Sequence, residues 1–223
     1  MPESTTLGRL AVAATAVDAP WGPIHVAAGE RGIVAIELVT SRDAFVADLE
    51  RRFKGPVTWV LAGAPVHAPR LDGGVDPATA TPAAAAQAAF HMRAGMAAIA
   101  VALAGVDSAL VSLPLDLADR PAWDRAVLGA VRTIPRGATR SYGEIARQVG
   151  SPGAARAVGG AVGRNPIALA IPCHRVIAGY GTLGGYGGGW WGERERLLDL
   201  KAELLAGEGR IVRRRPSEPG GAR

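Results

Sequence analysis

Residues 141–161 constrain the fold of this chain more than any other segment does. Ser141 and Glu144 have the spacing of a capping box, in which each of the two residues satisfies a free backbone donor at the start of a helix. Gly150 ends that short helix, and Ser151-Pro152 supplies a cap and a first-turn proline for a second helix. Two short helices joined by a tight glycine turn are typical of a helix-turn-helix motif, although helical hairpins that bind nothing share the pattern.

The second helix of this hairpin has an unusual composition. Residues 154–161 contain one arginine, Arg156, among alanine, glycine and valine. Glycine destabilises a helix by about 1 kcal/mol per residue relative to alanine, so small residues here indicate that something must approach the helix closely. A nucleic-acid groove would meet that description.

The chain has a single cysteine, Cys173, in the run Ile171-Pro172-Cys173-His174-Arg175-Val176. A thiol attacks as its thiolate, which requires a base or positive surroundings to lower a pKa of about 8.5. His174 and Arg175 provide both, and they favour a nucleophile over the alternative of a small buried apolar side chain. One cysteine also excludes a disulfide within the chain and predicts a reducing compartment.

Charge is distributed unevenly along the chain. Residues 1–112 carry 8 basic and 10 acidic side chains, a net charge of −2, whereas residues 113–223 carry 17 and 10, a net charge of +7. The basic half contains the predicted helix-turn-helix, as expected for a surface that meets phosphates. The scattered histidines have no metal-ligand spacing, so no metal is expected. No signal peptide and no apolar run long enough to span a membrane is evident, which predicts a soluble cytoplasmic protein.

The remaining periodicity predicts two domains and a tail. We expect an amino-terminal domain over residues 1–113, a DNA-binding and active-site domain over residues 114–206, and a disordered tail over residues 207–223. The elements expected are a hairpin in residues 10–39, helices in residues 43–53 and 83–104, a long loop in residues 62–88, a short strand or extended link in residues 110–115, and a helix from residue 121 that faces Trp123, Val127, Leu128 and Val131 inward.

Residues 135–198 resemble the active-site domain of the O6-alkylguanine-DNA alkyltransferases. The resemblance rests on Ser141-Tyr142, the run from Ala155 to Ala161, Asn165-Pro166, the run from Ile171 to Ile177, Gly185-Tyr186 and Leu197-Leu198. It implies an α+β fold: a small ribonuclease-H-like α/β amino-terminal domain, with a mostly helical, winged-helix-like carboxy-terminal domain that holds the helix-turn-helix. Weaker similarity over residues 21–36 extends the resemblance to nearly the whole chain.

The family resemblance also implies roles for individual residues. Cys173 takes the alkyl group irreversibly, His174 accepts the thiol proton through a water, Asn165 ties the turn before the active-site strand, and Tyr142 helps to rotate the nucleotide out of the duplex. The residues expected to contact DNA are Arg156, which replaces the extruded base, with Tyr142, Ala157, Gly159, Gly160 and Arg175; those expected to line the substrate pocket are Tyr186, Val162 and Pro172.

One position departs from the family pattern. The glutamate that orients the histidine is expected shortly after a pair of leucines, and counting from Leu197-Leu198 reaches Lys201. The segment of residues 187–192 is one residue longer than usual, which allows a shifted register with Asp199 or Glu203 in that role. Sequence alone leaves these three candidates open.

The expected function is therefore direct-reversal DNA repair. The resemblance implies a single-turnover, monomeric protein that needs no cofactor and transfers alkyl groups from O6-alkylguanine, and from O4-alkylthymine, in the minor groove of duplex DNA. Two other classes remain open at this point: a damage-sensing relative without efficient transfer, and a winged-helix transcription regulator in which the thiol only packs.

Overall fold

The computed structural model describes residues 12–54, 57–59, 82–187 and 194–214. Contacts within the chain divide it into two compact units, residues 1–119 and 120–223. The predicted boundary after residue 113 is therefore six residues too early. Residues 114–116 belong to the first unit because Ile33 exchanges backbone hydrogen bonds with Pro114 and Asp116, and Arg31 forms an ion pair with Asp116.

A four-stranded sheet forms the centre of the first unit. Its strands are β1 (Val12–Val17), β2 (Ile24–Gly29), β3 (Gly32–Leu38) and β4 (Val57–Trp59), in the order β3-β2-β1-β4. The first three form an antiparallel meander and β4 pairs parallel to β1. The single hairpin predicted in residues 10–39 is thus right in kind but not in number, because residues 12–38 form three strands and two successive hairpins.

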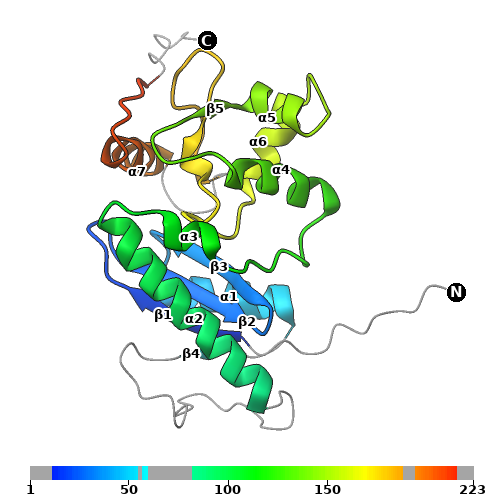
Figure 1. Cartoon of the computed structure of the whole chain (residues 1–223), viewed down its shortest axis with the longest axis vertical. Coiled ribbons are helices and arrows are strands. Elements are labelled where there is room, and N and C mark those ends of the chain that lie inside the picture. The colour runs from blue at the N-terminus through cyan, green and yellow to red at the C-terminus, as the bar shows by residue number, and fades with distance from the viewer. Residues whose placement is uncertain (1–11, 55–56, 60–81, 188–193, 215–223) are drawn as a thin grey trace, which may run out of the picture. The chain divides into compact units, whose positions relative to one another are not determined.

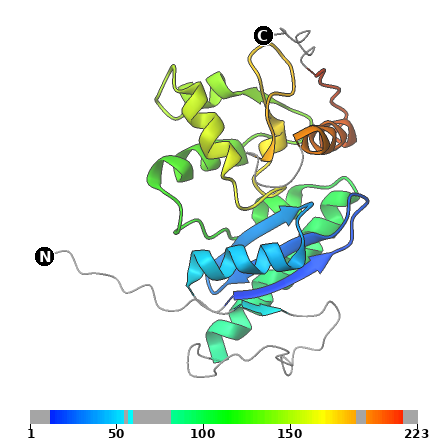
Figure 2. The ribbon, with the colours of Figure 1, turned by 180° about the vertical axis from the view of Figure 1, so that it is seen from behind.

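Helices cover both faces of this sheet. Helix α1 (Arg42–Phe53) lies over one face and α2 (Pro82–Leu103) over the other, as the opposite views of Figures 1 and 2 show. Ser41 caps α1 by accepting a hydrogen bond from the Ala44 N–H. On the other face, a methyl group added at Gly95 would lie 2.8 Å from the Ile33 side chain, so the glycine lets α2 pack closely on β3.

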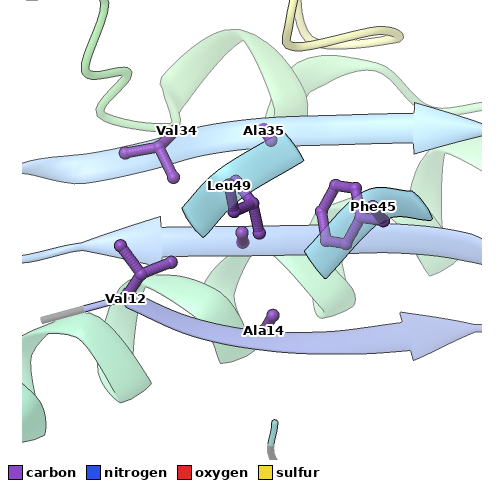
Figure 3. Packing of buried hydrophobic residues seen from close by; sticks show 7 residues of the cluster. Val12, Ala14, Val34, Ala35, Phe45 and Leu49 are labelled. Carbon is purple, nitrogen blue, oxygen red and sulfur yellow. The ribbon is translucent and has the colours of Figure 1, made fainter. Parts of the chain in front are cut away.

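The sheet and α1 enclose an apolar core. Phe45 and Leu49 of α1 point onto the strands, where Val12, Ala14 and Val34 meet them (Figure 3). All five side chains are buried. The helix expected in residues 43–53 therefore forms because its apolar face completes this core.

Two expectations for the first unit need correction. The helix α2 starts at Pro82, so residues 82–88 are helical rather than part of a loop, and residues 60–81 lie outside the described residues. The short strand or extended link expected in residues 110–115 is wrong for residues 110–112, which end the short helix α3 (Ser108–Ser112). Leu113 is extended and Leu115 forms an isolated bridge with Ile33. Among the described residues, α2 is the one helix whose length and composition would suffice to cross a membrane, a test that core helices also pass; a third of its most apolar 18-residue segment is buried in the structure.

The second unit is mostly helical. Its elements are α4 (Ala122–Arg132), β5 (Arg140–Ser141), α5 (Tyr142–Gln148), α6 (Ala155–Gly163), a single 3-10 turn η1 (Cys173–Arg175), β6 (Val176–Ile177) and α7 (Arg194–Gly207). Strands β5 and β6 pair in parallel, which brings the start of α5 beside the segment that follows Cys173. In α4, Val127, Leu128 and Val131 are buried as predicted, but Trp123 is only half buried.

The carboxy-terminal residues up to 214 are ordered. Arg213 forms a bridge with Thr182 and accepts a backbone hydrogen bond from Leu183. Glu208 binds three other residues, as described below. The tail predicted to start at residue 207 is therefore wrong for residues 207–214, and residues 215–223 lie outside the described residues.

Candidate active site

The helix-turn-helix forms largely as the sequence predicts. Both hydrogen bonds of the capping box between Ser141 and Glu144 are present at the start of α5. Gly150 adopts a positive φ of 74°, which lets the chain turn sharply after α5. The second helix begins at Ala155 rather than at Ser151-Pro152, and no side chain caps it.

The exposed side of α6 carries small residues and one arginine. Arg156, Ala157 and Gly160 are exposed, and Gly159 is half buried against the ring of Tyr142. The predicted DNA-contacting residues of this helix therefore lie at or near its surface. The guanidinium of Arg156 is thus surrounded on this side of α6 by alanine and glycine rather than by large side chains.

Asn165 braces the turn that carries the cysteine. Its side-chain oxygen accepts the Ile167 N–H at 3.1 Å, and its amide nitrogen donates to the Ile171 carbonyl at 2.9 Å. Asn165 is 2% exposed, so both hydrogen bonds are shielded from water. Because Ile171 lies two residues before Cys173, these two hydrogen bonds link Asn165 to the backbone that leads into the 3-10 turn.

The thiol of Cys173 is buried among polar groups. Burial raises its pKa, while the Asn165 amide, the Lys201 charge and the Tyr186 hydroxyl each act in the opposite direction. The thiol is therefore protonated at rest and needs a base before it can attack.

His174 is held by a carboxylate, Glu208. His174 Nε2 lies 2.8 Å from Glu208 Oε1, and both side chains are almost fully buried. Burial alone would raise the pKa of Glu208, but the hydrogen bonds and charges of His174 and Arg175 outweigh it and lower the pKa to about 2. The carboxylate is thus ionised at neutral pH and acts only as an acceptor.

The protonation of His174 follows from this pairing. Burial lowers the pKa of His174, and the hydrogen bond to Glu208 offsets this only in part, so the ring is neutral at rest. Because Glu208 can only accept, the single ring proton sits on Nε2 and the lone pair sits on Nδ1. Among the described residues Nδ1 is buried without a hydrogen-bond partner, and it can therefore take up a proton.

The three sequence candidates for orienting the histidine are all wrong. Asp199 is exposed and pairs with Arg214, Glu203 is exposed, and Lys201 points elsewhere. The register error has a simple origin, because α7 contains a second leucine pair, Leu204-Leu205. The count that reaches Lys201 from the first pair reaches Glu208 from the second.

Lys201 is a fully buried cation whose hydrogen bonds go to backbone carbonyls and whose ammonium lies 5.9 Å from the centre of the Tyr186 ring. Its ammonium donates to the carbonyls of Val176, Leu183 and Gly185 at 2.5–2.9 Å. Burial lowers its pKa to about 8, so the group is still charged at neutral pH. Lys201 thus joins the strand after the cysteine to the segment before Tyr186.

Arg175 is buried as well, against the prediction that it contacts DNA. Its guanidinium binds both oxygens of Glu208 at 2.7–3.1 Å and donates to the Ile134 carbonyl at 2.8 Å. Glu208 also accepts the Gly137 N–H. With 4% of Arg175 exposed, the side chain fixes Glu208 instead of reaching a phosphate.

The predicted pocket residues are near the thiol or buried around it. Tyr186 is buried and interacts with Cys173. Pro172, which directly precedes Cys173, and Val162 of α6 are buried as well. Tyr142 is half buried, its hydroxyl donates to the Gly185 carbonyl, and burial raises its pKa to about 12. A methyl group added at Gly184 would lie 3.2 Å from the Tyr142 ring, which places this ring against the segment before Tyr186.

The described residues contain no group of three or more side chains that could hold a metal ion. Cys173, His174 and Glu208 together can supply one buried sulfur nucleophile, a neutral imidazole base and an ionised carboxylate that supports the imidazolium form.

Comparison with known proteins gives a consistent result. Residues 122–210 match the family model described as 6-O-methylguanine DNA methyltransferase, DNA binding domain. The methylated-DNA–protein-cysteine methyltransferase of Mycolicibacterium paratuberculosis is 59% identical over 88 residues, which are 40% of this chain and 48% of that protein. The chain thus matches about half the length of this curated relative.

Solved structures extend the similarity over both units. The crystal structure of the Mycobacterium tuberculosis O6-methylguanine methyltransferase is 30% identical, covers 93% of this chain and 96% of its own, and has a TM-score of 0.58. The same organism's protein in complex with DNA is also 30% identical, with a TM-score of 0.55 and coverage of 88% and 92%.

Proposed function

This chain belongs to the O6-methylguanine methyltransferase family, and from that premise we propose that it repairs DNA by moving an alkyl group from O6-alkylguanine to its own Cys173. The observation that carries the proposal is the buried His174–Glu208 pair directly after Cys173 in the chain, in which the imidazole is neutral and held by the carboxylate. Each molecule acts once, without a cofactor.

The proposed reaction is a displacement at carbon. The Cys173 sulfur attacks the alkyl carbon, an S–C bond forms as the C–O6 bond breaks, and the electron pair of that bond remains on the guanine. His174 takes the thiol proton on Nδ1, and Glu208 stabilises the imidazolium. The same proton ends on the guanine, so that alkylguanine and thiol become guanine and thioether.

Duplex DNA must open before this attack, because the target atom is inside the base stack. Unstacking one nucleotide costs a few kcal/mol, and Arg156 on the exposed side of α6 would fill the gap left by the base. Ala157, Gly159 and Gly160 would allow α6 to enter the minor groove, and Tyr142 would crowd the target phosphate. We assign the flipped base to the pocket of Tyr186, Val162 and Pro172, and O4-alkylthymine as a second substrate.

Finer features of the fold belong to the same proposal. The order β3-β2-β1-β4, with an antiparallel meander and a parallel β4, supports a ribonuclease-H-like first unit. The hairpin of α5 and α6 followed by the β5-β6 pair supports a winged-helix-like second unit. We further propose that the protein acts as a monomer in the cytoplasm.

Intact mass spectrometry tests the proposal directly. The protein is incubated with duplex DNA that contains O6-methylguanine, and the expected result is a gain of one CH2 unit, a methyl group in place of the thiol proton, mapped to Cys173. Cys173→Ala should gain no mass while it binds DNA nearly as well as the unchanged protein. A protein that binds the lesion but gains no mass would instead be a damage sensor, and binding to one fixed sequence would indicate a transcription regulator.

A further inference from the structure

An ion pair joins two helices of the second unit at a point that the proposed mechanism does not use. Asp124 lies in the first turn of α4, and Arg164 is the residue that caps the carboxyl end of α6. Arg164 Nε and one terminal nitrogen donate to the two oxygens of Asp124 at 2.9 and 2.8 Å. Two parallel bonds of this kind fix the orientation of the guanidinium as well as its position.

The burial of Asp124 is what makes the pair unusual. The carboxylate is 1% exposed, whereas the Arg164 side chain is 47% exposed. A buried carboxylate is unfavourable unless it is paired, and its position on the inner side of α4 would otherwise suit an apolar residue. The half-exposed Arg164 guanidinium could be solvated by water and does not need Asp124 to be stable. The main effect of the pair is therefore to hold Arg164 in one position.

Arg164 is attached to the residue that braces the active site. The next residue is Asn165, whose side chain binds both the Ile167 N–H and the Ile171 carbonyl and whose amide approaches the Cys173 thiol. Movement of the Arg164 backbone would therefore displace Asn165 directly. Because Arg164 and Asn165 share a peptide bond, the ion pair links α4 to the turn that Asn165 braces.

Gly160 makes room for the arrangement. A methyl group added at Gly160 would lie 3.2 Å from the Arg164 guanidinium, so the arginine side chain folds back along α6 over this glycine. The glycine thus has a second reason to be small, beside the approach of DNA.

We propose that Asp124 is a positioning residue for alkyl transfer, which acts through Arg164 to hold Asn165, and through Asn165 the thiol of Cys173, in the reactive arrangement. The proposal rests on the proposed function. It assigns a chemical role to a residue remote from the substrate and separates that role from DNA binding.

The test compares reaction with free O6-methylguanine base and binding to an undamaged duplex. For Asp124→Asn we expect the second-order rate with the free base to fall by about tenfold or more, since a displaced reacting group loses rate steeply, while the dissociation constant for DNA stays nearly unchanged. The pH–rate profile should also shift to higher pH, because a loosened Asn165 amide no longer lowers the pKa of the thiol. A purely structural role would not shift that profile.

Further variants keep the test decisive. Arg164→Lys retains the charge and one hydrogen bond, so its rate should lie between those of Asp124→Asn and the unchanged protein. If Asp124→Asn folds poorly, Arg164→Lys still tests the proposal. Arg125→Gln on the exposed side of α4 and Asp199→Asn on α7 are matched controls, with rates expected to equal that of the unchanged protein.

Two outcomes would overturn the positioning role. A normal free-base rate in both variants, with weaker DNA binding by Arg164→Lys, would make Arg164 a phosphate contact instead. A normal rate and normal binding would leave the pair without a part in function. Both presuppose transfer by the unchanged protein; if that protein transfers nothing to Cys173, it is the proposed function that fails.

Discussion

His174 and Glu208 form a 2.8 Å hydrogen bond although 34 residues separate them in the chain. The glutamate follows the last turn of α7, and Arg175 and the Gly137 N–H hold it in place. The proposed base for the thiol is therefore oriented by a residue that directly follows α7, the last helix of the second unit.

Replacing this carboxylate should slow transfer. Glu208→Gln keeps an oxygen that can accept from His174 but removes the negative charge, so the imidazolium loses its stabilisation. We expect the transfer rate near neutral pH to fall by about tenfold or more, as part of the contribution of general-base catalysis. Rapid-quench measurement of the mass gain checks this, with Glu203→Gln, an exposed glutamate of the same helix, as the control. Equal rates for the two variants would mean that Glu208 has no part in activating the thiol.

The same substitution should change the pH dependence of stability. The pKa of Glu208 is about 2 in the folded protein against 4.5 as its ordinary value, so the carboxylate stabilises the fold above about pH 4.5. This contribution should disappear as the pH falls through about 2, and at neutral pH it amounts to about 3 kcal/mol at most. Urea unfolding of the unchanged protein and Glu208→Gln should converge in acid. A constant difference in unfolding free energy at all pH values would contradict the assignment.

Arg156 should matter only where a base must leave a duplex. Arg156→Ala is expected to slow transfer from duplex DNA far more than transfer from the free base, since only the duplex pays for unstacking. The two rates are measured on one preparation, with Arg147→Ala, an exposed arginine of α5, for comparison. Equal losses on both substrates would place Arg156 in the chemistry or the fold.

Lys201 should be required for the site to hold together. Lys201→Met keeps most of the side-chain volume but removes the ammonium donor from three carbonyls, of which, among the described residues, only that of Gly185 keeps a second side-chain donor, the Tyr142 hydroxyl. A buried carbonyl that loses its donor costs about 1–3 kcal/mol. We expect a lower melting temperature and slower transfer. Lys201→Glu should be worse, because it places a carboxylate against carbonyl oxygens. Unchanged melting would show that water replaces the ammonium.

Glu37 provides a test in the first unit. Burial, with the charge of Asp48, raises the pKa of this carboxyl to about 7 from 4.5, so its protonated form favours the fold. Stability should therefore fall as the pH rises from about 4.5 through 7, by about 3 kcal/mol at most. Glu37→Gln should remove that fall, which urea unfolding at acidic and mildly alkaline pH would detect; a parallel fall in both proteins would assign it to another group.

The features that the sequence predicted are those with local signals. The capping box of Ser141 and Glu144 and the inward face of α4 depend on neighbours a few residues away, and the structure contains both. Cys173 and His174 are adjacent in the chain, so the sequence alone predicts that they lie close together. The buried neutral state of His174, in contrast, depends on packing that no short motif encodes.

The features that were missed depend on distant contacts. Glu208 was overlooked because two leucine pairs precede it, and only the packing of α7 decides which pair sets the register. The burial of Arg175 was missed for a related reason, since an arginine beside a nucleophile looks like a phosphate ligand until Glu208 is placed next to it. No sequence pattern indicated that Asp124 would be buried on the inner side of α4 and paired with Arg164.

The binding of Lys201 by three backbone carbonyls has a consequence for which substitutions this chain can tolerate. Its three acceptors are backbone carbonyls, which every amino acid supplies, so positions 176, 183 and 185 can exchange residues of suitable size without losing the contact. Position 201 has no such freedom. A deep mutational scan should therefore find one intolerant position whose partners appear permissive, and statistical covariation between columns would not detect the interaction.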